Sequence, residues 1–204
     1  MESLAREVRE KYADKLVKVN LTSLKAIYKA EGLELEYRSI NSARIRAMYF
    51  CDEVGCTVMV KKELRMEQKL FSMAHELKHH LADRDDIEAG TYFCGDYHAN
   101  ARVEVGAEVF AAELIYPRSE VIREWSSFGL SAQCSAEDIV RFKVRFGRPI
   151  SYRTLLKRLE LCKLVVTSRF DGTKFKVLED KLFPPFYKDP SFKLRRAARA
   201  KKIY

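Results

Sequence analysis

Residues that interrupt regular structure are scarce in this chain, with eight glycines and five prolines among 204 residues. Their scarcity excludes collagen-like and low-complexity disordered proteins, which are rich in both. Uncharged apolar runs are also short, and none approaches the roughly 18 residues that a membrane span requires. Hydrophobic residues make up 47% and charged residues 33% of the chain. These values indicate a soluble globular protein with room for one domain and an appendage.

Signals for export are also missing. The first 16 residues mix acidic and basic side chains and contain no apolar core followed by small residues. The five cysteines are odd in number and irregularly spaced, which makes a poor disulfide framework for a secreted domain. Cys51 and Cys56 lie across an expected hairpin, but no second pair completes a zinc knuckle. We therefore expect a cytoplasmic protein with buried or half-buried reduced thiols.

Acidic residues are absent from the end of the chain, where most of the formal net charge of +9 is found. From Phe192 onward the only charged side chains are basic: Lys193, Arg195, Arg196, Arg199, Lys201 and Lys202. In the rest of the chain, acidic and basic residues are nearly equal in number, which argues against a dedicated DNA-reading face. We expect nucleic acid as a partner only through this basic tail, and no membrane contact. The sequence leaves the oligomeric state open.

Hydrophobic periodicity predicts an α+β fold that is mostly helical. A small sheet of hairpin-like strands should pack near the central helix. The expected elements before residue 117 are helices around 4–12 and 24–28, strands at 33–37, 44–50 and 57–61, a helix at 66–81, a loop at 82–100, and a helix at 101–116.

Helical patterning resumes after Pro117, around residues 121–125, 136–146 and 151–159. Two short segments, Val165–Ser168 and Lys174–Val177, flank an Asp-Gly turn signal and predict a terminal hairpin. We therefore divide the chain into a domain over residues 1–165 and a C-terminal extension over residues 166–204, made of this hairpin and the basic tail.

The string HELKH, from His75 to His79, carries the chemistry. Residues four apart lie on the same face of a helix, so both imidazoles can point at one ion. A catalytic zinc site uses three protein ligands and leaves the fourth position to water. Glu76, at the edge of the same face, can take a proton from that water as general base and return it to the departing amine. A third ligand is therefore required.

The helix expected at 101–116 is the next element that can supply the third ligand. Glu104 and Glu108 share a face with Ala107 and Ala111, small residues that let another helix approach closely. Either carboxylate can complete the site. Glu113 falls on a different side, where solvent or an indirect contact is the simpler role.

The stretch from HELKHHL to FAAELIYP resembles the ImmA/IrrE family of metallopeptidases. That family has a HExxH helix followed by a helix reading roughly ExEANxFAAELLMP. The likeness runs from about residue 5 to about residue 165, and the FAAELxxP core is its specific part. Residues 151–164 are similar to a later family stretch of the form SxxxLxxRLxxLxL. The length of the chain matches the short, ImmA-like members.

The resemblance implies zinc as cofactor, with His75, His79 and Glu104 as ligands and Glu76 as general base. It also implies an endopeptidase that cleaves a helix-turn-helix transcriptional repressor of a mobile element or stress regulon and thereby relieves repression. Two positions depart from the pattern, because Glu108 stands for an asparagine and Gly106 for an acid. A carboxylate at position 108 can compete for the metal or bond a ligand histidine.

Other polar residues have less defined expected roles. His80 lies about 100° around the helix from His79, which favours packing or an indirect contact over coordination. His98, Tyr92 and Tyr97 fall in the loop between the two helices and are candidate donors to the oxyanion. The alternative to an enzyme is a regulatory module that binds a repressor or nucleic acid without catalysis.

Overall fold

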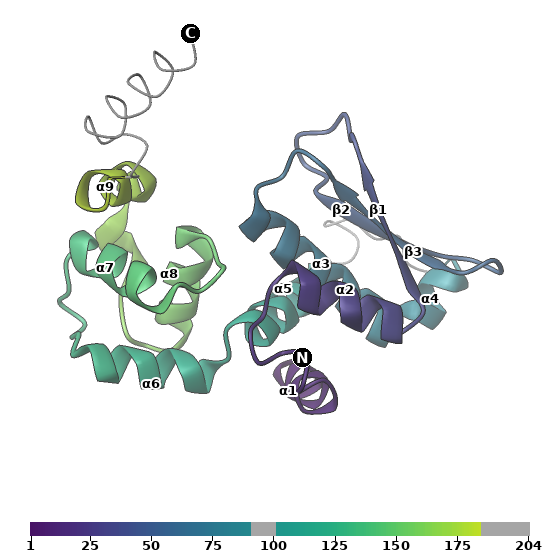
Figure 1. The fold of residues 1–204 in the computed structure, drawn as a ribbon, viewed down its shortest axis with the longest axis horizontal. Coiled ribbons are helices and arrows are strands. Elements are labelled where there is room, and N and C mark those ends of the chain that lie inside the picture. Colours follow the sequence, from purple (N-terminus) through teal and green to yellow (C-terminus); the bar gives the residue numbers. More distant parts are fainter. Residues whose placement is uncertain (91–100, 185–204) are drawn as a thin grey trace, which may run out of the picture.

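The computed structural model describes residues 1–90 and 101–184. Within these ranges it contains nine α-helices, a short 3-10 helix and three strands. Figure 1 shows the sheet and helices α1 to α5 on one side and helices α6 to α9 on the other. This arrangement confirms the expected α+β class, in which helices predominate. The basic tail lies outside the described residues.

The sheet contains β1 (Leu33–Arg38), β2 (Ala47–Cys51) and β3 (Cys56–Lys61) in the order β1-β3-β2. Strands β2 and β3 pair antiparallel as the expected hairpin. Strand β1 instead pairs parallel with β3, so the expectation of hairpin-like strands throughout was wrong. The chain between β1 and β2 carries no tight turn and allows β2 to pass to the far edge. Alternate residues of β3 are buried, which gives the sheet one core face.

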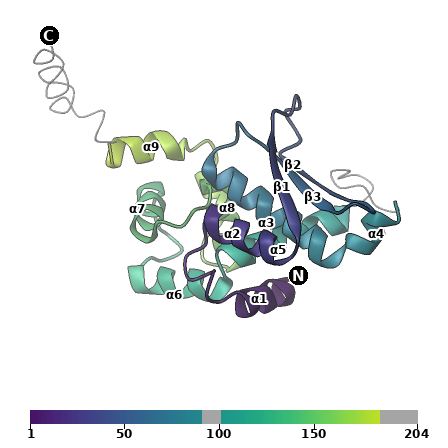
Figure 2. The ribbon, with the colours of Figure 1, turned by 45° about the vertical axis from the view of Figure 1, so that its right-hand side comes forward.

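Helices α1 (Glu2–Lys11), α2 (Leu21–Ala30), α3 (Met66–Ala82) and α5 (Ala101–Ile115) surround this core. Figures 1 and 2 show α2 and α3 against the sheet, with α5 beside α3. Tyr28 of α2 donates a hydrogen bond to the carbonyl of Met73, which ties α2 to the middle of α3. Ala107 and Ala111 of α5 are fully buried, and their small side chains allow a close approach of helices.

The remaining helices are α4 (Arg84–Glu88), α6 (Arg118–Phe128), α7 (Ala136–Phe146), α8 (Tyr152–Leu161) and α9 (Phe175–Leu182). Glycines with positive φ, at 75° for Gly129 and 59° for Gly147, end α6 and α7 in the left-handed conformation that glycine tolerates best. Within the part of the chain that the structure describes, no helix has the length and apolar character of a membrane crossing.

The expected terminal hairpin was wrong. Thr167–Phe170 is a 3-10 helix, and Phe175 begins helix α9. Phe175, Leu178 and Leu182 recur at helical spacing, which outweighs the β-branched residues nearby. The rings of Phe175 and Tyr152 stack with centroids 4.9 Å apart, and α9 packs mainly against α7. The boundary at residue 165 itself remains a prediction.

Cys51 and Cys56 occupy directly opposed positions of the β2–β3 hairpin and form a disulfide. The expectation of reduced thiols at these two positions was therefore wrong. Strand pairing brings together two cysteines that irregular spacing alone does not connect. Cys134 and Cys162 are free and buried, as expected.

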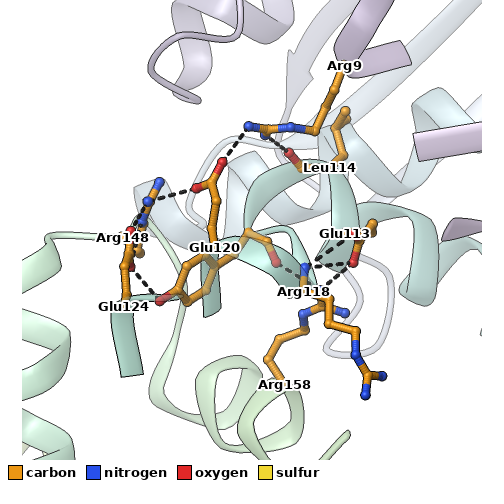
Figure 3. A network of polar contacts seen from close by, with 9 residues as sticks. Arg9, Glu113, Leu114, Arg118, Glu120, Glu124, Arg148 and Arg158 are labelled. Carbon is orange, nitrogen blue, oxygen red and sulfur yellow. Dashed lines mark hydrogen bonds and ion pairs between the residues drawn. The ribbon is translucent and has the colours of Figure 1, made fainter. Parts of the chain in front are cut away.

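A polar network joins the two sides of the molecule where α5 meets α6 (Figure 3). Arg9 of α1 donates to the carbonyl of Leu114 at 2.7 Å and to Glu120 at 2.8 Å. Arg148 contacts Glu120 at 2.7 Å and also pairs with Glu124. These charges fix the direction in which the chain leaves α5, and α5 carries part of the site described next.

Candidate metal centre

His75 and His79 lie one turn apart on α3, and both are buried. Their ring centroids are 5.0 Å apart, so the two imidazoles face the same space. The helix sets this geometry by itself, because side chains at i and i+4 project from one face. Leu70, Met73, Ala74 and Leu77 bury the other faces of α3 and hold its position.

Glu104, in the first turn of α5, completes a group of three potential ligands. Its Oε2 lies 3.1 Å from Nε2 of His75, and its Oε1 lies 3.9 Å from Nε2 of His79. Atoms bound tetrahedrally to zinc at about 2.0–2.1 Å are themselves about 3.3 Å apart. The three side chains therefore fit around a zinc ion with little rearrangement. The side chain of Glu104 is only 2% exposed, which excludes it from an ordinary surface role.

Negative charge dominates the surroundings of His75. Burial lowers the pKa of His75, but the hydrogen bond with Glu104 and the charges of Glu76 and Glu108 raise it by more. The net direction is upward, which shows that a positive charge is favoured at this imidazole. A divalent cation bound by the group would satisfy the same preference.

Asp83 orients the second histidine. Its Oδ2 lies 2.6 Å from Nδ1 of His79, at the junction of α3 and α4. A hydrogen bond donated by Nδ1 leaves the lone pair of Nε2 directed toward Glu104, which is the tautomer a metal ligand needs. Burial alone would raise the pKa of Asp83, but hydrogen bonds from His79 and Lys78 hold it below its usual value. Asp83 therefore acts as a charged acceptor.

Sequence reasoning assigned Asp83 to the loop after the helix and missed this role. The signal was nevertheless present, because Asp83 follows His79 by four residues and α3 continues to Ala82. The same i, i+4 rule that pairs the two histidines also pairs His79 with this carboxylate.

Glu76 is buried beside the two histidines, with 4% of its surface exposed. Its charge raises the pKa of both His75 and Tyr28, so the carboxylate lies within electrostatic range of the first potential ligand. A carboxylate next to the ligands, and not among them, is suited to proton transfer.

The family model described as the IrrE N-terminal-like domain matches residues 29–160. The match covers more than half of the chain and includes all of α3 and α5. The chain belongs to the ImmA/IrrE family of metallopeptidases. No protein in the search of curated sequences matches it. The grouping of His75, His79 and Glu104 in this ImmA/IrrE chain agrees with a metallopeptidase role.

Other residues singled out from the sequence occupy different places in this ImmA/IrrE chain. The side chain of Glu108 is 48% exposed and lies 3.5 Å from Nζ of Lys157, outside the group of three potential ligands. Nδ1 of His80 lies 3.1 Å from the hydroxyl of Tyr49, so His80 connects α3 to strand β2. Glu113 is buried against Arg158, not exposed to solvent. His98, Tyr92 and Tyr97 lie outside the described residues.

Proposed function

We propose that this chain is a zinc-dependent endopeptidase that cleaves a helix-turn-helix transcriptional repressor in the cytoplasm and so relieves repression. The observation that carries the proposal is the convergence of His75, His79 and Glu104, with Glu76 adjacent on the same helix. The family match supports the hydrolytic part of the proposal. The repressor follows from the family resemblance, and the cytoplasm is the compartment expected from the sequence.

The residues have distinct parts in the proposed reaction. His75, His79 and Glu104 would hold the ion, and Asp83 would keep His79 in the required tautomer. When bound, zinc polarises the peptide carbonyl and lowers the pKa of water. Glu76 accepts the proton of the attacking water and delivers it to the departing amine, which conserves the proton over the cycle.

Burial strengthens this chemistry. His75, Glu76, His79 and Glu104 are all less than 10% exposed. Charges in such a site interact through a lower effective dielectric than charges at the surface, so each fixed carboxylate has a larger effect on a developing charge. A purely structural ion would need no buried carboxylate beside the ligands, and Glu76 therefore favours catalysis over a passive site.

The test compares the natural chain with the Glu76→Gln variant. Both proteins are loaded with zinc, and their metal content is measured before each is incubated with a repressor encoded near the gene. We expect cleavage by the natural chain only, with equal zinc content, because glutamine keeps the shape but cannot accept the proton. Failure of the zinc-loaded natural chain to cut any such repressor would contradict the proposal.

The same variant tests the non-enzymatic alternative. A module that acts by binding alone would keep its effect on repression after Glu76→Gln. Loss of that effect, together with retained zinc, favours hydrolysis. The basic tail is tested separately by truncation after Pro190 and a salt titration, because contacts to phosphates weaken steeply with salt.

A further inference from the structure

Lys78 is an unusual residue for the position it occupies. It lies on α3 directly before His79, and only 3% of its surface is exposed. Lysine is almost never fully buried unless its ammonium group is paired, because desolvating the charge is costly. A lysine at this position therefore requires specific partners.

Two partners surround the ammonium group. Nζ of Lys78 lies 2.6 Å from Oδ2 of Asp83 and 3.4 Å from the carbonyl of Val103, just before Glu104 on α5. The same Oδ2 of Asp83 lies 2.6 Å from Nδ1 of His79. One carboxylate oxygen is thus shared between an ammonium group and a potential metal ligand.

The stem of Lys78 passes beside Gly106 of α5. A Cβ atom at position 106 would lie 3.8 Å from Cε of Lys78 and 3.2 Å from Cγ of Met1. Glycine inside a helix costs roughly 0.5–1 kcal/mol relative to alanine. The distance to Cε of Lys78 is an ordinary van der Waals contact, so the tight contact that the glycine avoids is with Met1.

Stability alone gives a weak reason for this lysine. Replacing a buried ion pair by apolar groups of similar volume is often neutral or stabilising. Charge at the site gives a stronger reason. Glu76 and Glu104 are buried carboxylates, Asp83 is a half-buried one, and Lys78 is a buried ammonium group that pairs with Asp83. Three negative charges and one positive charge leave a balance that a single divalent cation neutralises.

We propose that Lys78 is a positioning residue for the metal centre, holding Asp83 so that Asp83 fixes the orientation of His79 and linking this unit to the start of α5. The inference rests on the proposed zinc site and adds a residue that acts through Asp83. Substitution of a residue that orients a metal ligand without binding the metal typically weakens metal affinity about 10–100-fold.

The test is a double-mutant cycle on zinc affinity, measured by competition with a chromophoric chelator. Lys78→Met keeps the apolar stem and removes the charge, and Asp83→Asn removes the carboxylate. We expect each variant to bind zinc about 10–100-fold more weakly. The double variant should bind about as weakly as Asp83→Asn alone, since Lys78 acts through Asp83. Lys69→Met, the same change at a position elsewhere on α3, should leave the affinity unchanged.

A second readout distinguishes positioning from general loosening of the fold. The visible spectrum of the cobalt-substituted protein should change in Lys78→Met, since the orientation of His79 changes, and stay the same in Lys69→Met. If Lys78→Met does not fold, Lys78→Gln is measured with the same expected loss. The inference is overturned if the Lys78 variant binds zinc as tightly as the natural chain. It is also overturned if the losses of zinc affinity caused by the two single substitutions add up in the double variant.

The outcomes also separate this inference from the proposed function. A natural chain that binds no zinc overturns both. A natural chain that binds zinc, with unchanged affinity after Lys78→Met, overturns only the role of Lys78. Failure to cleave a repressor leaves the affinity cycle unaffected, because that cycle measures no peptidase activity.

Discussion

Arg158 of α8 forms a buried ion pair with Glu113 near the end of α5 (Figure 3). The guanidinium group also donates to the carbonyl of Tyr116 at 2.9 Å, and Glu113 accepts from the backbone N–H of Arg118. One pair of side chains thus holds the C-terminal end of α5, the start of α6 and the middle of α8. The helix that it anchors is the one that presents Glu104 at its other end.

Removal of Arg158 should therefore be strongly destabilising. We expect Arg158→Met to lower the free energy of unfolding by about 3–5 kcal/mol, because it leaves the Glu113 carboxylate buried without its cation. Urea titration followed by circular dichroism measures the change. Lys157→Met is the matched control, since Lys157 pairs with Glu108 at the surface. Such an exposed pair contributes about 0–1 kcal/mol. Equal losses of unfolding free energy in the two variants would contradict the stabilising role of the buried ion pair.

Asp138 should stabilise helix α7 in a pH-dependent way. Hydrogen bonds from the backbone and hydroxyl of Ser135 hold the pKa of Asp138 below its usual value. The unfolded state then binds the proton more tightly, so this stabilisation is present above pH 3.8 and is lost as pH falls through the folded pKa. We expect Asp138→Ala to cost about 1 kcal/mol near neutral pH.

Urea titrations of Asp138→Ala at neutral and acidic pH check this sign. The difference from the natural chain should shrink in acid, where Asp138 is protonated in both states. Glu137→Ala, at the preceding residue, is the control, because Ser135 and Asp138 form the capping box. A cost that grows in acid would contradict the prediction.

Local patterns of the sequence predicted the elements that carry the metal group. Helices α3 and α5 have apolar stripes at helical spacing, and the HExxH string places two potential ligands within one helix, so no long-range information is needed. Glu104 could be preferred over Glu108 only through the family pattern. The structure adds that the carboxylate of Glu104 lies close to both His75 and His79.

Features that depend on contacts between distant segments were not predictable. The parallel pairing of β1 with β3 depends on where the chain crosses between strands, which hydrophobic alternation does not encode. The ion pair of Glu113 with Arg158 joins positions 45 residues apart. Helix α9 was missed because a short β-branched segment and a turn signal also suit a hairpin.

The Cys51–Cys56 disulfide gives a further test. Alkylation of the unfolded protein without reductant should modify Cys134 and Cys162 and leave Cys51 and Cys56 unmodified. The loop closed by this bond is short, so the loop-entropy relation gives a stabilisation of about 2 kcal/mol. Cys51→Ser should lose about this amount and become insensitive to dithiothreitol. Alkylation of Cys51 and Cys56 before reduction would show that the bond is absent.

Metal removal should lower thermal stability through the three ligands. A metal present at 100 times its dissociation constant stabilises the folded state by about 2.7 kcal/mol, provided that it does not bind the unfolded chain. For a chain of this size, that corresponds to a rise in Tm of about 5–10 °C on adding zinc to the chelated protein. Glu76→Gln should keep this rise, because Glu76 is not among the three grouped ligands.

Two glutamate substitutions decide the third ligand. Glu104→Ala should abolish the zinc-dependent rise in Tm, because Glu104 contacts both histidines. Glu108→Ala should keep it, because the carboxylate of Glu108 is directed toward Lys157 and remains outside the ligand group. Scanning calorimetry with and without zinc measures both variants. The reverse pattern would transfer the ligand role to Glu108 and would require the start of α5 to rotate when the metal binds.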